Sequence, residues 1–275
     1  MARSASLPPL PRALLAQLFA CAMAVSTGAA AAVDVGRFDT AAPQPPAPWQ
    51  EIRFDTAAPQ PPAPWQEIRF DTAVPPTRYR IRAWDGVMAI EAESEASMSL
   101  LARPIQADLQ ATPVLCWRWR IENRLDKADL RRREGDDYAA RVYLGFRLPP
   151  SSLGLATRAG LALARARHGE HVPDAALNYV WDNRYPVGTE AANAYTERTR
   201  MIVLRSDEAT TGRWQDERRD IAADAATAFG GEGVELTLLA VATDTDNTGE
   251  HARAGFADLH FVARGAQCRF TPDTH

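Results

Sequence analysis

The chain has very little cysteine and lysine, and it lacks the standard catalytic signatures. Lys127 is the single lysine among 275 residues, so arginine supplies almost all positive charge, and the formal net charge is −4. An acidic chain without a block of basic residues is not typical of nucleic-acid-binding proteins, so we expect no nucleic-acid partner. The sequence contains no GxSxG elbow, Walker loop, GxGxxG fingerprint or HExxH helix, which excludes the enzyme classes that these motifs define.

No apolar run in the sequence is long enough for a membrane-spanning helix. The longest, over 13–26, follows two arginines and precedes a small-residue stretch that ends at Ala32. It is shorter than the roughly 20 residues needed to cross a bilayer, so the pattern predicts a signal peptide over 1–32. A lipoprotein anchored at Cys21 is the alternative. We expect a periplasmic or secreted protein with no membrane span after cleavage.

Cleavage at this point leaves two cysteines, Cys116 and Cys268. In an oxidising compartment they can form a disulfide that ties a central strand to the C-terminal tail over 266–275. Alternatively, Cys116 is a small buried residue within the run VLCWRW. Neither a CxxC pair nor paired histidines accompany them, so the pattern does not indicate a zinc site.

A Pro- and Ala-rich region over 33–64 contains most of an unusual duplication. RFDTAAPQPPAPWQEI occupies 37–52 and recurs unchanged at 53–68. Two identical copies indicate a recent duplication, because solenoid repeats diverge and recur at least three times. The prolines favour an extended conformation, so we interpret 33–64 as a linker. Because the second copy runs directly into the domain, Trp65–Asp71 is predicted to be an edge strand, whereas Trp49–Asp55 is expected to lie in the linker.

Short runs of alternating apolar and polar residues dominate the rest of the chain. PVLCWRWRIE places Trp117 and Trp119 on one face of a strand, and YAARVYLGFR places Tyr138 and Val142 opposite Arg141. Strands are predicted over 65–71, 77–83, 86–93, 113–122, 138–147, 176–182, 200–206, 212–222, 234–244 and 255–263.

Helical patterns are scarce by comparison. The segment 152–169 is predicted to be a short helical insertion, and 222–230 holds one further turn or two. The combination predicts an all-β fold, namely a single antiparallel, jelly-roll-like β-sandwich over 65–265.

Charged residues on two predicted strands form the first candidate site. Asp136 and Asp137 immediately precede a strand that directs Arg141 away from the core, and Arg118 and Arg120 occupy the polar face of another strand. A carboxylate that accepts hydrogen bonds from these arginines is the simpler structural interpretation, whereas an acid/base pair is the catalytic one. We expect the three arginines to share the non-aromatic face of these two strands, and if that face is concave it can bind an anionic or sugar-like ligand.

Aromatic residues of the middle strands give a second interpretation. Trp181, in ALNYVWD, can stack on a sugar ring and is included in the candidate ligand site. Aromatic side chains at alternate strand positions are nevertheless more often part of the core.

The segment ATDTDNTGEHA over 242–252 is the candidate cation site. Asp244, Asp246 and Asn247 supply oxygen ligands on a tight turn, as calcium requires. It is not an EF-hand, since Gly255 stands where the bidentate glutamate belongs. The alternative is a polar connection whose side chains cap their own backbone. We expect no cofactor other than calcium.

Several motifs together resemble a known family. PVLCWRWRI, GDDYAARVYLGF, ALNYVW, GRWQDERRDI and VATDTDNTGEHARAGFADLHF are similar to an uncharacterised family of secreted bacterial proteins, domain-of-unknown-function family 3047, over roughly 65–263. The resemblance implies a β-rich envelope or secreted domain. It supplies no catalytic residues that can be transferred to this chain.

Three functions follow from these patterns as hypotheses. The first is non-catalytic binding of a glycan or another cell-envelope component through one sheet face. The second is a polysaccharide hydrolase or lyase that uses Asp136 or Asp137 with Arg141 and the loop at 244–246. The third is an envelope interaction or assembly module whose Pro-rich leader contacts a partner.

Overall fold

The computed structural model describes residues 32–36, 65–170, 172–206 and 210–274. The expected signal peptide over 1–32, apart from Ala32, and the first repeat strand, Trp49–Asp55, lie outside the described residues. Among the residues described, no helix combines the length and apolar composition required to cross a membrane.

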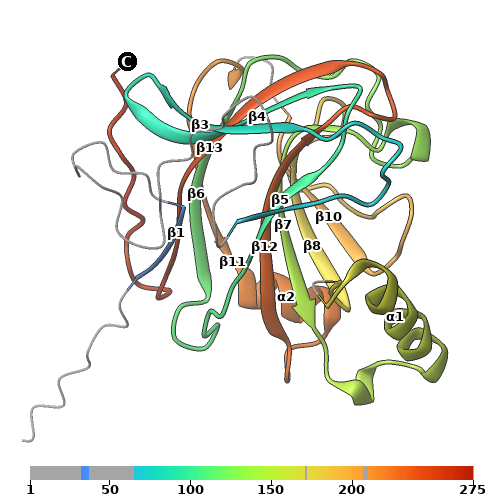
Figure 1. The fold of residues 1–275 in the computed structure, drawn as a ribbon. Coiled ribbons are helices and arrows are strands. Elements are labelled where there is room, and N and C mark those ends of the chain that lie inside the picture. Colours follow the sequence, from blue (N-terminus) through green and yellow to red (C-terminus); the bar gives the residue numbers. More distant parts are fainter. Residues whose placement is uncertain (1–31, 37–64, 171, 207–209, 275) are drawn as a thin grey trace, which may run out of the picture.

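Two sheets pack face to face (Figure 1). The first, sheet A, has the order β11-β6-β13-β4-β3, and β1 also pairs with β13. Its strands are β1 (Val33–Gly36), β3 (Arg78–Trp84), β4 (Val87–Glu95), β6 (Val114–Ile121), β11 (Gln215–Asp220) and β13 (His251–Val262).

The second, sheet B, has the order β2-β5-β12-β7-β8-β10-β9. Its strands are β2 (Gln66–Ile68), β5 (Leu100–Pro104), β7 (Tyr138–Arg147), β8 (Ala175–Trp181), β9 (Glu190–Ala192), β10 (Thr199–Arg205) and β12 (Glu235–Asp244). All neighbours are antiparallel except β8 and β10, which run parallel. The predicted antiparallel β-sandwich is confirmed, and the parallel pair of β8 and β10 is its one departure from antiparallel pairing among the described strands of sheet B.

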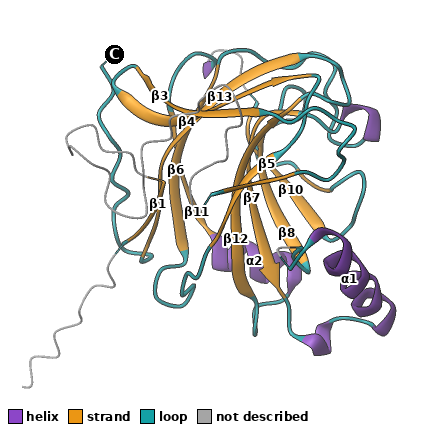
Figure 2. Cartoon of the chain, viewed as in Figure 1, coloured by secondary structure: helices purple, strands orange, loops and turns teal. Residues whose placement is uncertain are grey.

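Helices are few and lie outside the two sheets (Figure 2). Within the described ranges, two are 3-10 turns, η1 (Arg133–Gly135) and η2 (Pro150–Ser152), and two are α-helices, α1 (Leu155–His168) and α2 (Ile221–Phe229). Both predicted helical segments are therefore confirmed. Asp220 is the N-cap of α2, and its side chain accepts a hydrogen bond from the Ala223 amide.

The core between the sheets consists of the apolar faces of the alternating strands. Trp117 and Trp119 from β6 meet Tyr179 and Trp181 from β8, with ring centroids 5.5 Å apart for Trp117 and Tyr179 and 5.7 Å apart for Trp119 and Trp181. All four side chains are buried. Because paired aromatic rings add about 0.5–1.5 kcal/mol each beyond their buried area, this cluster anchors one sheet on the other.

Three strands escape prediction from the sequence, each for a physical reason. β5 is buried on both faces at its start, so its sequence LLARP shows no alternation. β9 is a three-residue edge strand, too short for a periodic signal. β1 lies at the start of the Pro- and Ala-rich region that we interpreted as a linker, and its pairing with β13 corrects that interpretation for 33–36.

The predicted edge strand is confirmed as β2, although it is shorter than expected. β2 forms the edge of sheet B next to β5, and the preceding Trp65 is 1% exposed in the core. Beyond the strand, Phe70 is 54% exposed. This segment therefore contributes one buried aromatic ring to the core and one exposed ring to the surface.

The two cysteines form a disulfide, which is the first of the two alternatives that the sequence offered. Cys116 of β6 is bonded to Cys268, with Cα atoms 5.8 Å apart, in the C-terminal segment. The bond ties this segment to the middle of sheet A, where Cys116 is fully buried.

Candidate functional site

A cavity of about 590 Å³ lies on the face of sheet B that points away from the core. It follows from the alternation of β7, since Val142 and Leu144 pack between the sheets whereas Arg141 and Tyr143 point the other way. Its volume lies within the roughly 300–1,000 Å³ range of ligand sites in proteins. It is lined by Phe70, Asp71, Val74, Met98, Leu100, Asp136, Arg141, Tyr143, Asn178, Asn193, Tyr195, Thr196, Thr199, Asp244, Asp246 and Asn247.

The topology of sheet B gathers the acidic residues at one end of this cavity. β7 and β12 are antiparallel neighbours, so the start of β7 lies beside the end of β12, with Tyr138 opposite Asp244. Asp136 and Asp137 directly precede β7, and Asp246 directly follows β12. Residues more than a hundred positions apart in the sequence therefore meet at one place.

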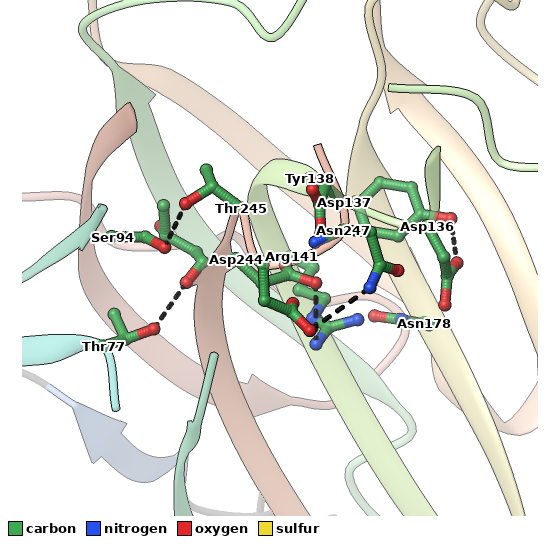
Figure 3. A network of polar contacts seen from close by, with 12 residues as sticks. Thr77, Ser94, Asp136, Asp137, Tyr138, Arg141, Asn178, Asp244, Thr245 and Asn247 are labelled. Atoms are coloured by element: carbon green, nitrogen blue, oxygen red, sulfur yellow. Dashed lines mark hydrogen bonds and ion pairs between the residues drawn. The ribbon is translucent and has the colours of Figure 1, made fainter. Parts of the chain in front are cut away.

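Arg141 is at the centre of the polar contacts (Figure 3). Its Nη2 lies 3.1 Å from Asp244 Oδ2. Asp136 Oδ1 accepts a hydrogen bond of 2.9 Å from the Tyr138 hydroxyl, and the amide of Asn193 donates to both oxygens of Asp136. These contacts fix the orientation of Asp136 and Asp244.

Tyr138 does not lie on the face that alternation predicts. It packs in a cluster with Val180 and Met201, and the Arg141 guanidinium lies 5.7 Å from its ring centroid. The expected grouping of Tyr138 with Val142 is wrong, because the pairing with β12 shifts register between Ala242 and Asp244. Such an irregularity turns the following side chain to the other face of the sheet.

Asp137 holds the loop that follows β12. Its two carboxylate oxygens accept hydrogen bonds from the backbone amides of Asn247, at 3.3 Å, and Thr248, at 2.6 Å. The side-chain amide of Asn247 donates to Asp246 Oδ2, and its carbonyl oxygen accepts from the Tyr195 hydroxyl. Oxygen atoms of Asp137, Asp244 and Asp246 lie within 4.8 Å of one another.

Three carboxylates that line the cavity, those of Asp136, Asp244 and Asp246, have raised pKa values. Burial raises the pKa of Asp136, and burial raises that of Asp244 well above its ordinary range despite the nearby Arg141 charge. Burial and the negative charge of Asp137 raise the pKa of Asp246 to about 6. All three shifts reflect the cost of placing several negative charges in a site with little solvent.

Three buried polar atoms of residues that line the cavity have no hydrogen-bond partner among the described residues. They are Arg141 Nε, Asn178 Oδ1 and Asp244 Oδ1. The residues are 6%, 2% and 1% exposed, respectively. Buried polar groups in proteins are nearly always paired, so these atoms mark where a ligand can form hydrogen bonds.

Two exposed aromatic rings complete the cavity. Phe70 and Tyr195 are each 54% exposed, in contrast to the buried aromatic residues of the core. A shallower hollow of about 170 Å³ shares Phe70, Leu100 and Tyr143 with the cavity and continues toward Pro173 and Leu238. Together the two hollows form a groove with an acidic end and an apolar end.

The structure separates the candidate site residues into three groups: those at the cavity, the two arginines of sheet A, and Trp181 in the core. It brings together Asp136, Arg141, Asp244, Asp246 and Asn247 in the cavity, with Asp137 directly beside them. Asn178, Phe70 and Tyr195 were missed, because single polar or aromatic residues in a strand or loop give no periodic signal.

Arg118 and Arg120 do not share a face with Arg141. They belong to β6 in sheet A, whereas Arg141 belongs to β7 in sheet B, so the expected common face is wrong. Arg118 pairs with Asp216 and Asp273, and Arg120 pairs with Asp85.

Trp181 lies in the core between the sheets and is 2% exposed. It is therefore a core aromatic residue, as the alternative to sugar stacking predicted, and it does not line the cavity.

The chain belongs to the family described as "Protein of unknown function (DUF3047)", which it matches over residues 63–260. No protein with a curated description matches it. The resemblance noted in the sequence is thus confirmed at the level of the family.

Among solved structures, the chain is similar to the xyloglucanase domain of NopAA from Sinorhizobium fredii in complex with cellobiose, with a TM-score of 0.37 and 8% identity over 73% of this chain and 93% of that one. It is also similar to endoglucanase 3 of Trichoderma harzianum, from family GH12, with a TM-score of 0.35 and 8% identity over 72% and 98%. The Cel12A catalytic domain of Humicola grisea gives a TM-score of 0.33 and 13% identity over 64% and 79%. At these values the similarity says nothing about activity.

Proposed function

We propose that the protein binds a neutral glycan in the cavity of sheet B. The observation that carries this proposal is a pair of buried atoms, Arg141 Nε and Asn178 Oδ1, that have no hydrogen-bond partner in the described part of the chain. They lie in the same cavity as two exposed aromatic rings. A sugar hydroxyl can accept a hydrogen bond from Nε and donate one to Oδ1. The apolar face of a sugar ring can pack on Phe70 or Tyr195.

The charge of the cavity selects among possible ligands. Asp71, Asp136, Asp244 and Asp246 line it, and Arg141 is the single cation among its described residues. This excess of negative charge repels uronates, phosphates and other anions. A neutral, polyhydroxylated ligand satisfies the polar atoms without adding charge, and the continuation of the groove accommodates more than one sugar unit.

A panel of neutral and uronate-containing oligosaccharides, measured by isothermal titration calorimetry, tests the proposal. We expect binding of a neutral member, weakened about tenfold by Tyr195→Ala or Phe70→Ala, because each variant removes one stacking surface. Leu155→Ala, at an exposed position of α1 far from the cavity lining, is the matched control and should bind as the native chain does. Absence of binding across the panel, or equal loss in Leu155→Ala, contradicts the proposal.

Hydrolysis of the bound glycan is a second candidate. The observation that favours it is the convergence of Asp136, Asp244 and Asp246 on one cavity, since glycosidases place two carboxyl groups on either side of the scissile bond. Release of reducing ends from a bound oligosaccharide, lost in Asp136→Asn, supports hydrolysis. Binding without release of any product would show that the cavity recognises the glycan and does not hydrolyse it.

The proposed location is the periplasm or the exterior of the cell. The disulfide between Cys116 and Cys268 supports it, because such bonds persist in oxidising compartments. Cell fractionation followed by N-terminal sequencing should find a chain that begins near residue 33 outside the cytoplasm. A full-length chain in the cytoplasm with free thiols contradicts this proposal.

A further inference from the structure

The acidic end of the cavity holds more negative charge than its neighbours neutralise. Asp137, Asp244 and Asp246 have oxygen atoms within 4.8 Å of one another, and Asp136 also lines this end. The cationic partner among the described residues lining the cavity is Arg141, which pairs with Asp244 Oδ2. A group of partly desolvated carboxylates with one guanidinium is stabilised by a bound cation or by protonation.

A second observation points to the same place. Asp244 Oδ1 has no hydrogen-bond partner among the described residues, although the residue is 1% exposed. The other oxygen of this carboxylate is occupied by Arg141, so Oδ1 is the atom that remains available. A buried carboxylate oxygen without a donor is expensive, and a coordinated cation compensates it fully.

From these contacts we propose that Asp137, Asp244 and Asp246 bind a divalent cation, with calcium as the best match. Calcium lies 2.3–2.6 Å from its oxygen ligands, so ligand atoms on opposite sides of the ion are up to about 5 Å apart. The 4.8 Å limit for the three carboxylates therefore allows one ion to contact all of them. The donors are all oxygen, which selects calcium or magnesium over zinc and copper.

The ligand set differs from the one that the sequence predicts. Asn247 was expected beside Asp244 and Asp246, but its side-chain oxygen accepts from the Tyr195 hydroxyl and its amide donates to Asp246. Asp137 takes its place, because the antiparallel pairing of β7 and β12 brings it alongside. Asp137 is itself fixed by the backbone amides of Asn247 and Thr248, so the site needs little rearrangement.

Calorimetric and thermal titration of the chelator-treated protein with CaCl₂, and separately with MgCl₂, tests this proposal. We expect saturable heat at one site and a rise in Tm of about 5 °C at saturating calcium. Asp246→Asn removes a ligand charge at a half-buried position and should weaken calcium binding at least tenfold. Asp71→Asn, a cavity carboxylate outside the cluster, is the matched control and should retain native affinity.

The outcomes are separable from those of the glycan proposal. No heat and no change in Tm in the native chain with either metal overturns the cation site, as does equal affinity of Asp246→Asn and Asp71→Asn. If Asp246→Asn does not fold, Asp246→Glu, which keeps the charge but moves it outward by one methylene, replaces it and should shift the affinity. Oligosaccharide titrations in chelator then show whether the glycan binds independently of the metal.

Discussion

Replacing Cys116 and Cys268 together with alanine is expected to lower the free energy of unfolding by about 2–5 kcal/mol. The disulfide closes a segment of 152 residues. This segment includes β11 and β13 of sheet A and five of the seven strands of sheet B. Without the bond, the unfolded chain regains the freedom that closure of this long segment removes, and the chain-entropy estimate for such a length is about 5 kcal/mol. The C-terminal segment also loses its covalent attachment to β6.

Denaturant unfolding of the native chain, with and without a reducing agent, measures this effect. The double alanine variant should match the reduced native chain and show no further response to reductant. A single Cys268→Ala variant breaks the bond but keeps the buried Cys116 side chain, so it separates the effect of the lost bond from the effect of removing the sulfur atom of Cys116 from the core. Equal stability of oxidised and reduced native protein would contradict the expectation.

Arg141→Met is expected to cost about 3–5 kcal/mol, because it leaves Asp244 buried beside other carboxylates without its cationic partner. The Arg141 side chain is 7% exposed and that of Asp244 is 2% exposed, so water cannot replace the lost ion pair. The cost comes from the stranded charge. The double variant Arg141→Met/Asp244→Asn should therefore recover part of the stability.

Arg147→Met is the matched control for this prediction. Arg147 lies on the same strand, but its side chain is 30% exposed and pairs with the exposed Glu170. Its other acidic neighbour, Asp174, is buried but has a closer partner in Arg165, at 2.5 Å, which remains in the variant. Loss of an exposed pair costs about 1 kcal/mol or less. Chemical denaturation of the native chain and the three variants is measured in chelator, so that a bound metal does not mask the difference. Arg147→Met should be nearly as stable as the native chain, Arg141→Met should be the least stable, and the double variant should be more stable than Arg141→Met. Similar losses of unfolding free energy in Arg141→Met and Arg147→Met would show that the buried pair of Arg141 and Asp244 contributes no more to stability than an exposed pair.

Much of the fold follows from local alternation in the sequence. The runs around Trp117 and Val142 identify strands and their core faces, because burial of one face requires a period of two. Pairing does not follow, since it depends on contacts between distant segments. For that reason Arg118 was grouped with Arg141, although their strands lie in different sheets.

The candidate site was predictable to the same limited extent. Asp136 and Asp244 stand out because acidic residues at strand ends are natural ligands and acids. The sequence cannot reveal that these strand ends are neighbours, nor that Asn178 Oδ1 has no hydrogen-bond partner among the residues that the structure describes. The register shift that turns Tyr138 toward Asp136 is likewise a property of the pairing.

The order of the strands has a consequence for the synthesis of the chain. β12 and β13 follow all the other described strands in the chain, yet β12 joins β5 to β7 in sheet B, and β13 joins β6 to β4 in sheet A. Neither sheet can close until these strands have left the ribosome. At roughly 5–20 residues per second, the emerging chain spends most of its synthesis time with unpaired strand edges. The two sheets can therefore be completed only after β13 has emerged, and a chain that ends before β12 has two incomplete sheets.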